Sequence, residues 1–269
     1  NPFFPKTFVI NYVSKNYFDF LVATNDLKYD MSMRRIFLIV VSIIGMFPLL
    51  YSQEKHPPFG LSLEISSKYM WRGIEYGTAP IVFPMLTFEY KGFNVFTLGA
   101  YAFDGSHQEV DLGISYSYKK ITFGLSDYYY PSAVGEKDSY FQLSNRSTGH
   151  SAEAYLILVP FETSLWLTLS TYIFGADKKL NGDQAFSSYA EVGYTSNFGD
   201  SNNLSLALGA SLNKSFYTDY EKGFNVVNIA LKYTTRFAFG KFKLPVSASY
   251  VLNPYRGKSY ITFSLYFKS

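Results

Sequence analysis

The feature that most constrains this 269-residue chain is an alternation of polar and apolar residues that recurs about twelve times. In QEVDLGISYSY (108–118), Val, Leu, Ile and Tyr occupy the even positions, while Glu109, Asp111, Gly113 and Ser115 occupy odd ones. Successive side chains of a strand point to opposite faces, so each run predicts a strand with one apolar and one polar face. No convincing amphipathic helix follows residue 59. The predicted strands are 59–68, 80–90, 93–103, 108–118, 121–130, 151–160, 163–174, 186–197, 203–213, 225–235, 242–252 and 259–268.

The connections between these runs alternate in length. The short ones are 91–92, 119–120, 161–162, 198–202 and 236–241, and the long ones are 69–79, 104–107, 131–150, 175–185, 214–224 and 253–258. Short periplasmic turns and longer extracellular loops are typical of bacterial outer-membrane barrels, and strands of about ten residues suit a tilted membrane crossing. We therefore predict an all-β, antiparallel transmembrane barrel of about twelve strands (10–14). A count of ten would follow if 59–68 or 186–197 paired differently.

The N-terminal region predicts export. Met31-Ser-Met-Arg-Arg is followed by an apolar run at 36–50 and then by Ser52. This is the pattern of a signal peptide over 31–52 that is cleaved after Ser52. The apolar run is shorter than a membrane-spanning helix requires, although an uncleaved anchor is the alternative. We interpret 1–30 as an upstream extension outside the native structure, a genuine short extension being the alternative, and 53–269 as the barrel in the bacterial outer membrane.

Composition limits the possible partners. Residues 1–52 hold five basic and three acidic residues, which leaves 19 basic and 18 acidic residues, a net charge of +1, in the barrel. This balance argues against a nucleic-acid partner, which would favour a basic face. The chain has no cysteine, and DKKLNGD (177–183) lacks the acid spacing of a calcium loop. No phosphate loop or dinucleotide fingerprint is present, so we expect neither a metal nor a cofactor.

Charged residues on the polar parity predict a polar lumen. Arg72, where the first strand enters its loop, can clamp a facing carboxylate such as Glu75 or Glu109. It is either a selectivity residue at the mouth or an interior salt bridge that holds the first and last strands. In one interpretation, acids on one wall and bases on the other create a field that orients polar solutes. In the alternative, these charges pair with one another and plug the interior. The pore-lining candidates are Glu64, Lys68, Arg72, Glu89, Glu109, Asp111, Glu153, Glu191, Lys232 and Lys243.

Aromatic residues at strand ends predict girdles at the two lipid–water interfaces, although ordinary aromatic core residues are the alternative. The last strand, 260–267, resembles the terminal signal that barrel-insertion machinery recognises. Asp127 falls on the lipid-facing parity, which requires either an interfacial position or a bulge. The girdle candidates are Tyr128, Tyr129, Tyr130, Phe237, Tyr250 and Phe267.

Enzymatic chemistry has little support. The three histidines lie outside the regular runs, at His56, His107 and His150. His150 and Ser151 are adjacent, but a base and a nucleophile must meet in space with an orienting third group. We expect no enzyme.

Four segments together resemble the TorF-type porins, a bacterial outer-membrane family of unknown function. They are SKYMWRGIEYG (67–77), EVDLGISYSY (109–118), SDYYYP (126–131) and AEAYLIL (152–158). The resemblance covers 60–160 well and the rest only by pattern, and it implies an outer-membrane diffusion channel without naming a solute. Twelve strands give a barrel of only about 25 Å between opposite backbones, which favours ions or small polar solutes. The alternatives are a closed structural or surface-interaction barrel acting through loops 131–150 and 214–224, and an outer-membrane hydrolase.

Overall fold

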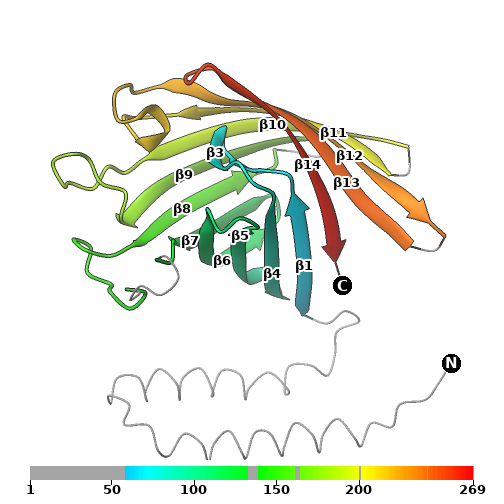
Figure 1. The fold of residues 1–269 in the computed structure, drawn as a ribbon, viewed down its shortest axis with the longest axis horizontal. Helices are drawn as coiled ribbons and strands as arrows, with labels where there is room; N and C mark the ends of the chain where they lie inside the picture. The colour runs from blue at the N-terminus through cyan, green and yellow to red at the C-terminus, as the bar shows by residue number, and fades with distance from the viewer. Residues whose placement is uncertain (1–57, 133–138, 161–163, 200, 241, 269) are drawn as a thin grey trace, which may run out of the picture. The chain divides into compact units, whose positions relative to one another are not determined.

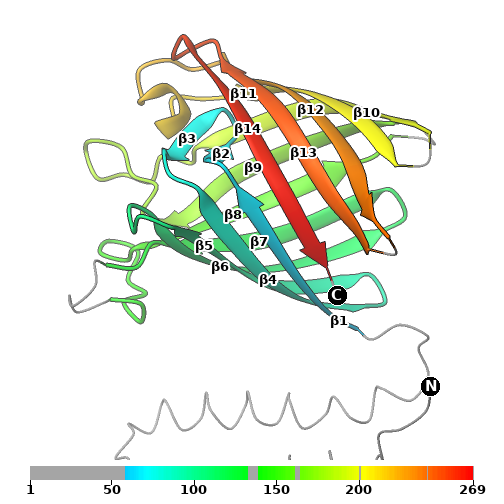
Figure 2. The ribbon, with the colours of Figure 1, turned by 45° about the vertical axis from the view of Figure 1, so that its right-hand side comes forward.

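Twelve antiparallel strands close into one barrel (Figures 1 and 2). The computed structural model describes residues 58–132, 139–160, 164–199, 201–240 and 242–268. Each strand pairs with its sequence neighbours, and β1 pairs with β14 to complete the circle. The barrel strands are β1 (Phe59–Ser66), β4 (Ile81–Tyr90), β5 (Phe93–Ala102), β6 (Gln108–Tyr118), β7 (Ile121–Tyr129), β8 (His150–Leu158), β9 (Leu165–Gly175), β10 (Ser188–Phe198), β11 (Asn202–Ser211), β12 (Asn225–Phe239), β13 (Phe242–Asn253) and β14 (Lys258–Lys268).

The predicted closed barrel of twelve strands is confirmed, and the alternative count of ten is wrong. One predicted connection, 236–241, is also wrong, because β12 continues to Phe239 and β13 already begins at Phe242. The proposed signal peptide and the 161–162 turn lie outside the described residues. Within the described part of the chain, no helix is long and apolar enough to cross a membrane.

The strands carry two different faces, as the alternation predicts. On β6, Glu109 and Asp111 are buried inside the barrel, whereas Leu112 and Ile114 point outward and are 43% and 48% exposed. The same outward parity is apolar on every side of the barrel. Its large side chains, between 39% and 63% exposed, include Leu86, Val95, Leu112, Ile114, Phe123, Leu125, Val192, Leu204, Leu206, Leu208, Leu231, Ile261, Phe263 and Leu265.

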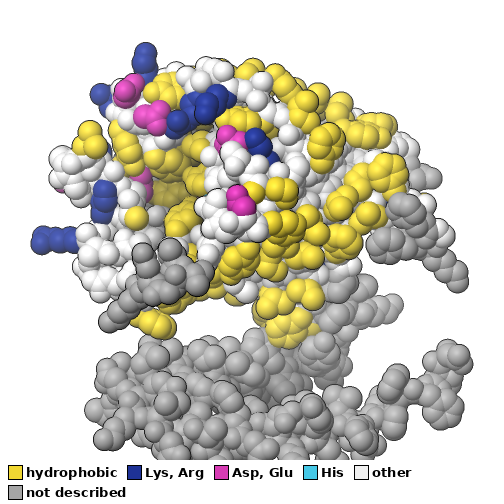
Figure 3. Space-filling model, in the orientation of Figure 1, with side chains coloured by type: hydrophobic (Ala, Val, Ile, Leu, Met, Phe, Trp, Pro, Cys, Tyr) yellow, Lys and Arg dark blue, Asp and Glu magenta, His cyan; other side chains and the backbone are white. Residues whose placement is uncertain are grey.

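The two ends of the barrel differ. At the turn end, hairpins such as 91–92 and 119–120 join the strands, and both ends of the described barrel lie there. The loop end carries the longer connections, among them the short 3-10 helix η2 (Phe216–Thr218). On the face shown in Figure 3, most charged side chains gather at the loop end, and hydrophobic side chains cover much of the strand surface. Polar loops and an apolar wall therefore occupy separate zones.

Inside the barrel, several aromatic rings lie on glycines of a neighbouring strand. A Cβ atom added to Gly193 would come within 2.1 Å of the Trp166 ring, so the ring packs directly on the backbone. Glycine covered in this way by a cross-strand ring is a known device for stabilising curved sheets. The arrangement holds the rings along the wall rather than across the lumen. The four pairs are Phe96–Gly113, Tyr155–Gly124, Trp166–Gly193 and Tyr189–Gly209.

Candidate functional site

A small hairpin in the first loop reaches into the barrel at its loop end. The sequence predicts a loop over 69–79, but the structure forms β2 (Tyr69–Trp71) and β3 (Ile74–Gly77) there. The turn consists of Arg72 and Gly73, whose φ angles are 51° and 79°. A two-residue hairpin turn of type I′ has positive φ at both positions, which Gly73 adopts without strain. We call residues 69–77 the plug hairpin.

The tip of the plug hairpin presses against the opposite wall. A Cβ atom on Gly73 would lie 2.0 Å from the carbonyl oxygen of Val227 on β12, so only glycine fits at this contact. The Asn253 side chain of β13 donates a hydrogen bond to the Gly73 carbonyl oxygen at 3.1 Å. The hairpin is therefore anchored to the last strands as well as to the first.

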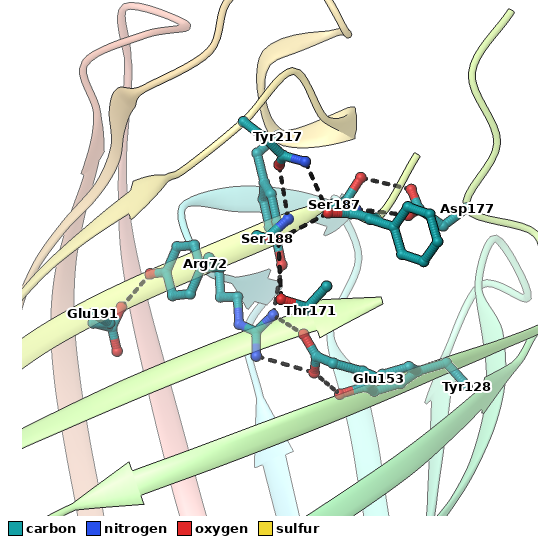
Figure 4. A network of polar contacts seen from close by, with 12 residues as sticks. Arg72, Tyr128, Glu153, Thr171, Asp177, Ser187, Ser188, Glu191 and Tyr217 are labelled. Carbon is teal, nitrogen blue, oxygen red and sulfur yellow. Dashed lines mark hydrogen bonds and ion pairs between the residues drawn. The ribbon is translucent and has the colours of Figure 1, made fainter. Parts of the chain in front are cut away.

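The Arg72 side chain crosses the lumen to β8 (Figure 4). Its guanidinium donates to both carboxylate oxygens of Glu153, at 2.5 and 3.1 Å, and Nη1 also donates to the Tyr217 hydroxyl at 2.5 Å. Tyr128 donates to Glu153 at 2.8 Å. Glu153 is 1% exposed and Arg72 13%, so this is a buried, bidentate ion pair. Burial raises the pKa of Tyr217, so its hydroxyl stays neutral while it accepts from Arg72.

Aromatic rings fill the space around this pair. The guanidinium lies 4.2 Å from the centroid of Trp71 and 4.7 Å from that of Tyr189, within the range of a cation–π contact. Trp71 and Ile74 of the hairpin pack against Tyr189, Tyr217 and a valine of β12. The loop half of the lumen is consequently occupied by paired charge and packed rings. This region is the barrel's constriction.

An acidic pair lies beside the constriction on β6. Glu109 and Asp111 are 2% and 4% exposed, and Glu109 contacts the His107 ring at 3.0 Å. Within the described residues, one oxygen of Asp111 is buried with no hydrogen-bond partner. These two carboxyl groups lie on the inner wall of the loop half.

The turn half of the lumen is different, because its charges are not paired with one another. Lys232 donates to the Tyr266 hydroxyl at 2.9 Å, and Glu89 accepts from Asn94 at 3.1 Å. Among the residues that the structure describes, no ion pair involves Glu64, Glu89, Lys232 or Lys243. Two further cations, missed by the sequence analysis, share the inward register here: Arg236 and Lys268.

The structure corrects the expected partner of Arg72. Glu75 pairs instead with Lys68, and Arg72 binds Glu153, 81 residues away, rather than Glu75 or Glu109. Its ion pair joins the first loop to β8, so it does not hold the first and last strands together. Another predicted lumen residue, Glu191, binds Tyr189 and accepts from Asn228 at 2.7 Å.

Five of the six expected girdle residues separate into two groups, and the sixth, Tyr129, is buried rather than exposed to lipid. Tyr128 points inward to Glu153 and contacts the Trp71 ring, so its assignment to a girdle is wrong. Tyr130 shares the inward parity of Tyr128 and contacts the His107 ring. By contrast, Phe237, Tyr250 and Phe267 are 56%, 47% and 37% exposed. This exposure is compatible with outward-facing girdle positions.

Asp127 lies outward without any bulge in β7, whose pairing with both neighbours is regular there. Its carboxylate contacts Nδ1 of His150 at 2.6 Å, and Nε2 of His150 contacts the Tyr140 carbonyl oxygen at 2.6 Å. The described part of the third loop, 139–149, thereby covers His150 and Tyr129, which are 5% and 3% exposed. Asp127 is accommodated on the outer face because His150, the first residue of β8, supplies a partner.

The same geometry bears on the hydrolase alternative. His150 and the following residue, Ser151, are consecutive in β8 and point to opposite faces of the sheet. Both ring nitrogens of His150 are already in hydrogen-bond contact. This pair cannot act as base and nucleophile.

Two residues of the constriction were missed by the sequence analysis. Tyr217 lies in a loop and Tyr189 within a strand, and neither stands out by type in a chain with 25 tyrosines. For the hairpin itself a local signal exists, because Arg72-Gly73 divides two short alternating segments, a pattern typical of a hairpin.

No protein-family model matches the chain, and no curated protein matches it. A structure from work on in-meso crystallization of membrane proteins has a TM-score of 0.45 and 7% identity, covering 78% of this chain and 83% of that chain. A bacterial polysaccharide outer membrane secretin gives 0.34 and 13%, covering 80% and 100%. An outer membrane channel from Pseudomonas putida F1 gives 0.41 and 12%, covering 81% and 97%. With TM-scores below 0.5, the fold assignment rests on the strand pairing of this chain itself.

Proposed function

We propose that the protein is a bacterial outer-membrane channel, of the TorF porin type, for passive diffusion of ions or small polar solutes. The observation that carries the proposal is a closed barrel with an apolar outer wall and a charged lumen. Contiguous apolar surface of this extent is unfavourable in water and marks an interaction surface. Lipid would cover it at no such cost, and closure gives every strand two paired neighbours, so no strand has a wholly unpaired edge in hydrocarbon.

The lumen supports passage of polar rather than apolar solutes. Its turn half carries Glu64, Glu89, Lys232 and Lys243 without ion pairs between described residues, so these charges can interact with a solute. Its loop half is filled by the plug hairpin around Arg72. Passage thus depends on the hairpin, which makes the channel narrow or intermittently open.

Planar-bilayer recording tests this function. The protein would be purified from the outer-membrane fraction and reconstituted, and its conductance measured at low and high salt. We expect small, discrete steps from the wild type and a higher open probability from Arg72→Ala. Arg146→Ala, which removes an exposed loop arginine, is the matched control and should match the wild type. Silence from folded, heat-modifiable wild type and Arg72→Ala protein would overturn the channel.

The buried constriction specifically favours one second candidate, a closed barrel that acts through its loops. Its ion pair and packed rings fill the loop half as a protein interior does. If that candidate holds, Arg72→Ala should destabilise the barrel without producing conductance. Stability and conductance measured on the same variant therefore separate the two functions.

A further inference from the structure

The barrel wall has an open seam between β13 and β14 at the turn end. Pairing between these strands runs from Asn253↔Lys258 to Val246↔Leu265 and stops there. On the far sides pairing continues, to Ser62↔Lys268 for β14 and to Phe239↔Phe242 for β13. Figure 1 shows the two strands diverging toward this end. Residues 242–245 and 266–268 therefore face one another without a backbone ladder.

Local chemistry explains where the ladder stops. The last residue of β13 that pairs with β14 is Val246. The next residue toward the turn end is Pro245, which has no backbone N–H to donate. On the other strand, the Tyr266 hydroxyl is bound inside the lumen by Lys232 at 2.9 Å and Ser247 at 3.0 Å. The inner surface is held together while the wall beside it remains open.

A cavity of about 510 Å³ occupies this seam. Part of its lining belongs to the outer face, where Leu61 is 54% exposed and Phe267 pairs with Leu63. The rest includes Lys243 and Lys268, which share the inward register at the rim of the barrel. An apolar surface and two cations thus meet in one cavity.

These features define the chemistry of an occupant. An acyl chain could cover the leucines and the phenylalanine, and an anionic group could lie between the two ammonium groups. Basic pockets on the surfaces of membrane proteins bind anionic lipid head groups in this way, and the volume lies within the range of ordinary ligand sites. Lysine also reaches readily from an apolar wall to a polar interface.

We propose that this seam, which we call the lateral seam, binds an anionic phospholipid of the surrounding membrane. The acyl chain lies on Leu61, Leu63 and Phe267, and the phosphate lies between Lys243 and Lys268. This inference rests on the proposed membrane location, but not on the proposed conductance.

Native mass spectrometry of the full-length protein in detergent tests the site. Phosphatidylglycerol, phosphatidylcholine and inorganic phosphate would be added separately. We expect retention of phosphatidylglycerol over phosphatidylcholine, with affinity falling about thirtyfold in the double variant Lys243→Gln/Lys268→Gln. Lys258→Gln, at the opposite end of β14, is the charge-matched control and should bind as the wild type does.

A second variant tests the seam independently of charge. Because the chain has no cysteine, Leu244→Cys with Phe267→Cys places a single disulfide across the unpaired segment. We expect the oxidised form to exclude phosphatidylglycerol. The reduced form should bind it, but more weakly than the wild type does, because the variant lacks the Phe267 ring.

Three results would overturn the site: equal retention of both lipids, unchanged binding by the double lysine variant, or binding of inorganic phosphate as tight as that of phosphatidylglycerol. Failure of the membrane location would show differently, as protein missing from the outer-membrane fraction. Failure of the channel would leave lipid binding intact.

Discussion

Replacing Glu153 by glutamine should release the plug hairpin. Glu153 accepts two hydrogen bonds from Arg72 and one from Tyr128, and it is almost fully buried. Glu153→Gln keeps the shape of the side chain but removes its charge. The guanidinium is then left inside the constriction without a counter-ion, and the hairpin can relieve this by moving into water.

The magnitude follows from the burial of the pair. Removing one partner of a buried salt bridge costs about 3–5 kcal/mol, since the remaining charge is uncompensated. With each 1.4 kcal/mol worth a factor of ten, the ratio of docked to undocked hairpin should fall by about a hundredfold to a few thousandfold. Tyr128→Phe removes one hydrogen bond to the carboxylate, worth about 1.5–3 kcal/mol, and should have a smaller effect.

Single-channel recording measures this ratio directly as open probability. We expect Glu153→Gln to open far more often than the wild type, at the same unitary conductance, because the open pore is the same. A double-mutant cycle with Arg72→Met isolates the pair. Once Arg72 is absent, Glu153→Gln should have little further effect on opening.

Two results would refute this reasoning. If folded Glu153→Gln conducted as the wild type does, the ion pair would not hold the hairpin. If the two substitutions were additive in the cycle, Arg72 and Glu153 would act independently in spite of their contact.

Three further predictions concern other contacts. Gly73→Ala should also raise open probability, because its Cβ atom meets the wall and its positive φ adds about 1–3 kcal/mol of strain; an unchanged recording would contradict the plug. Asp127→Ala should leave His150 without its carboxylate partner and speed proteolysis within 139–149. The measurement is the cleavage rate of the folded protein. A rate equal to that of the wild type would show that the contact does not hold the loop. Gly193→Leu should displace the indole ring that covers the glycine and lower the free energy of unfolding by about 1–3 kcal/mol. This would be measured as a lower midpoint temperature of heat modification. An unchanged midpoint would contradict the packing argument.

Much of the fold follows from the sequence because strand alternation is a local property. Each residue of a run such as 108–118 shows by its own polarity which face it occupies, and short links such as Lys91-Gly92 fix which strands are neighbours. The inward position of Glu109 and Asp111 and the outward position of Leu112 follow from parity alone.

The candidate site does not follow in the same way, because its contacts join residues far apart in the chain. No residue near Arg72 in the sequence indicates that it binds Glu153 rather than Glu75. The two residues meet because closure of the barrel brings β8 opposite the first loop. Asp127 is similar, since its partner His150 becomes a neighbour only through the register of β7 with β8. Local polarity and turn length thus determined the strands and their faces. Closure, register and the path of one hairpin decided which charges pair and where the lumen is filled.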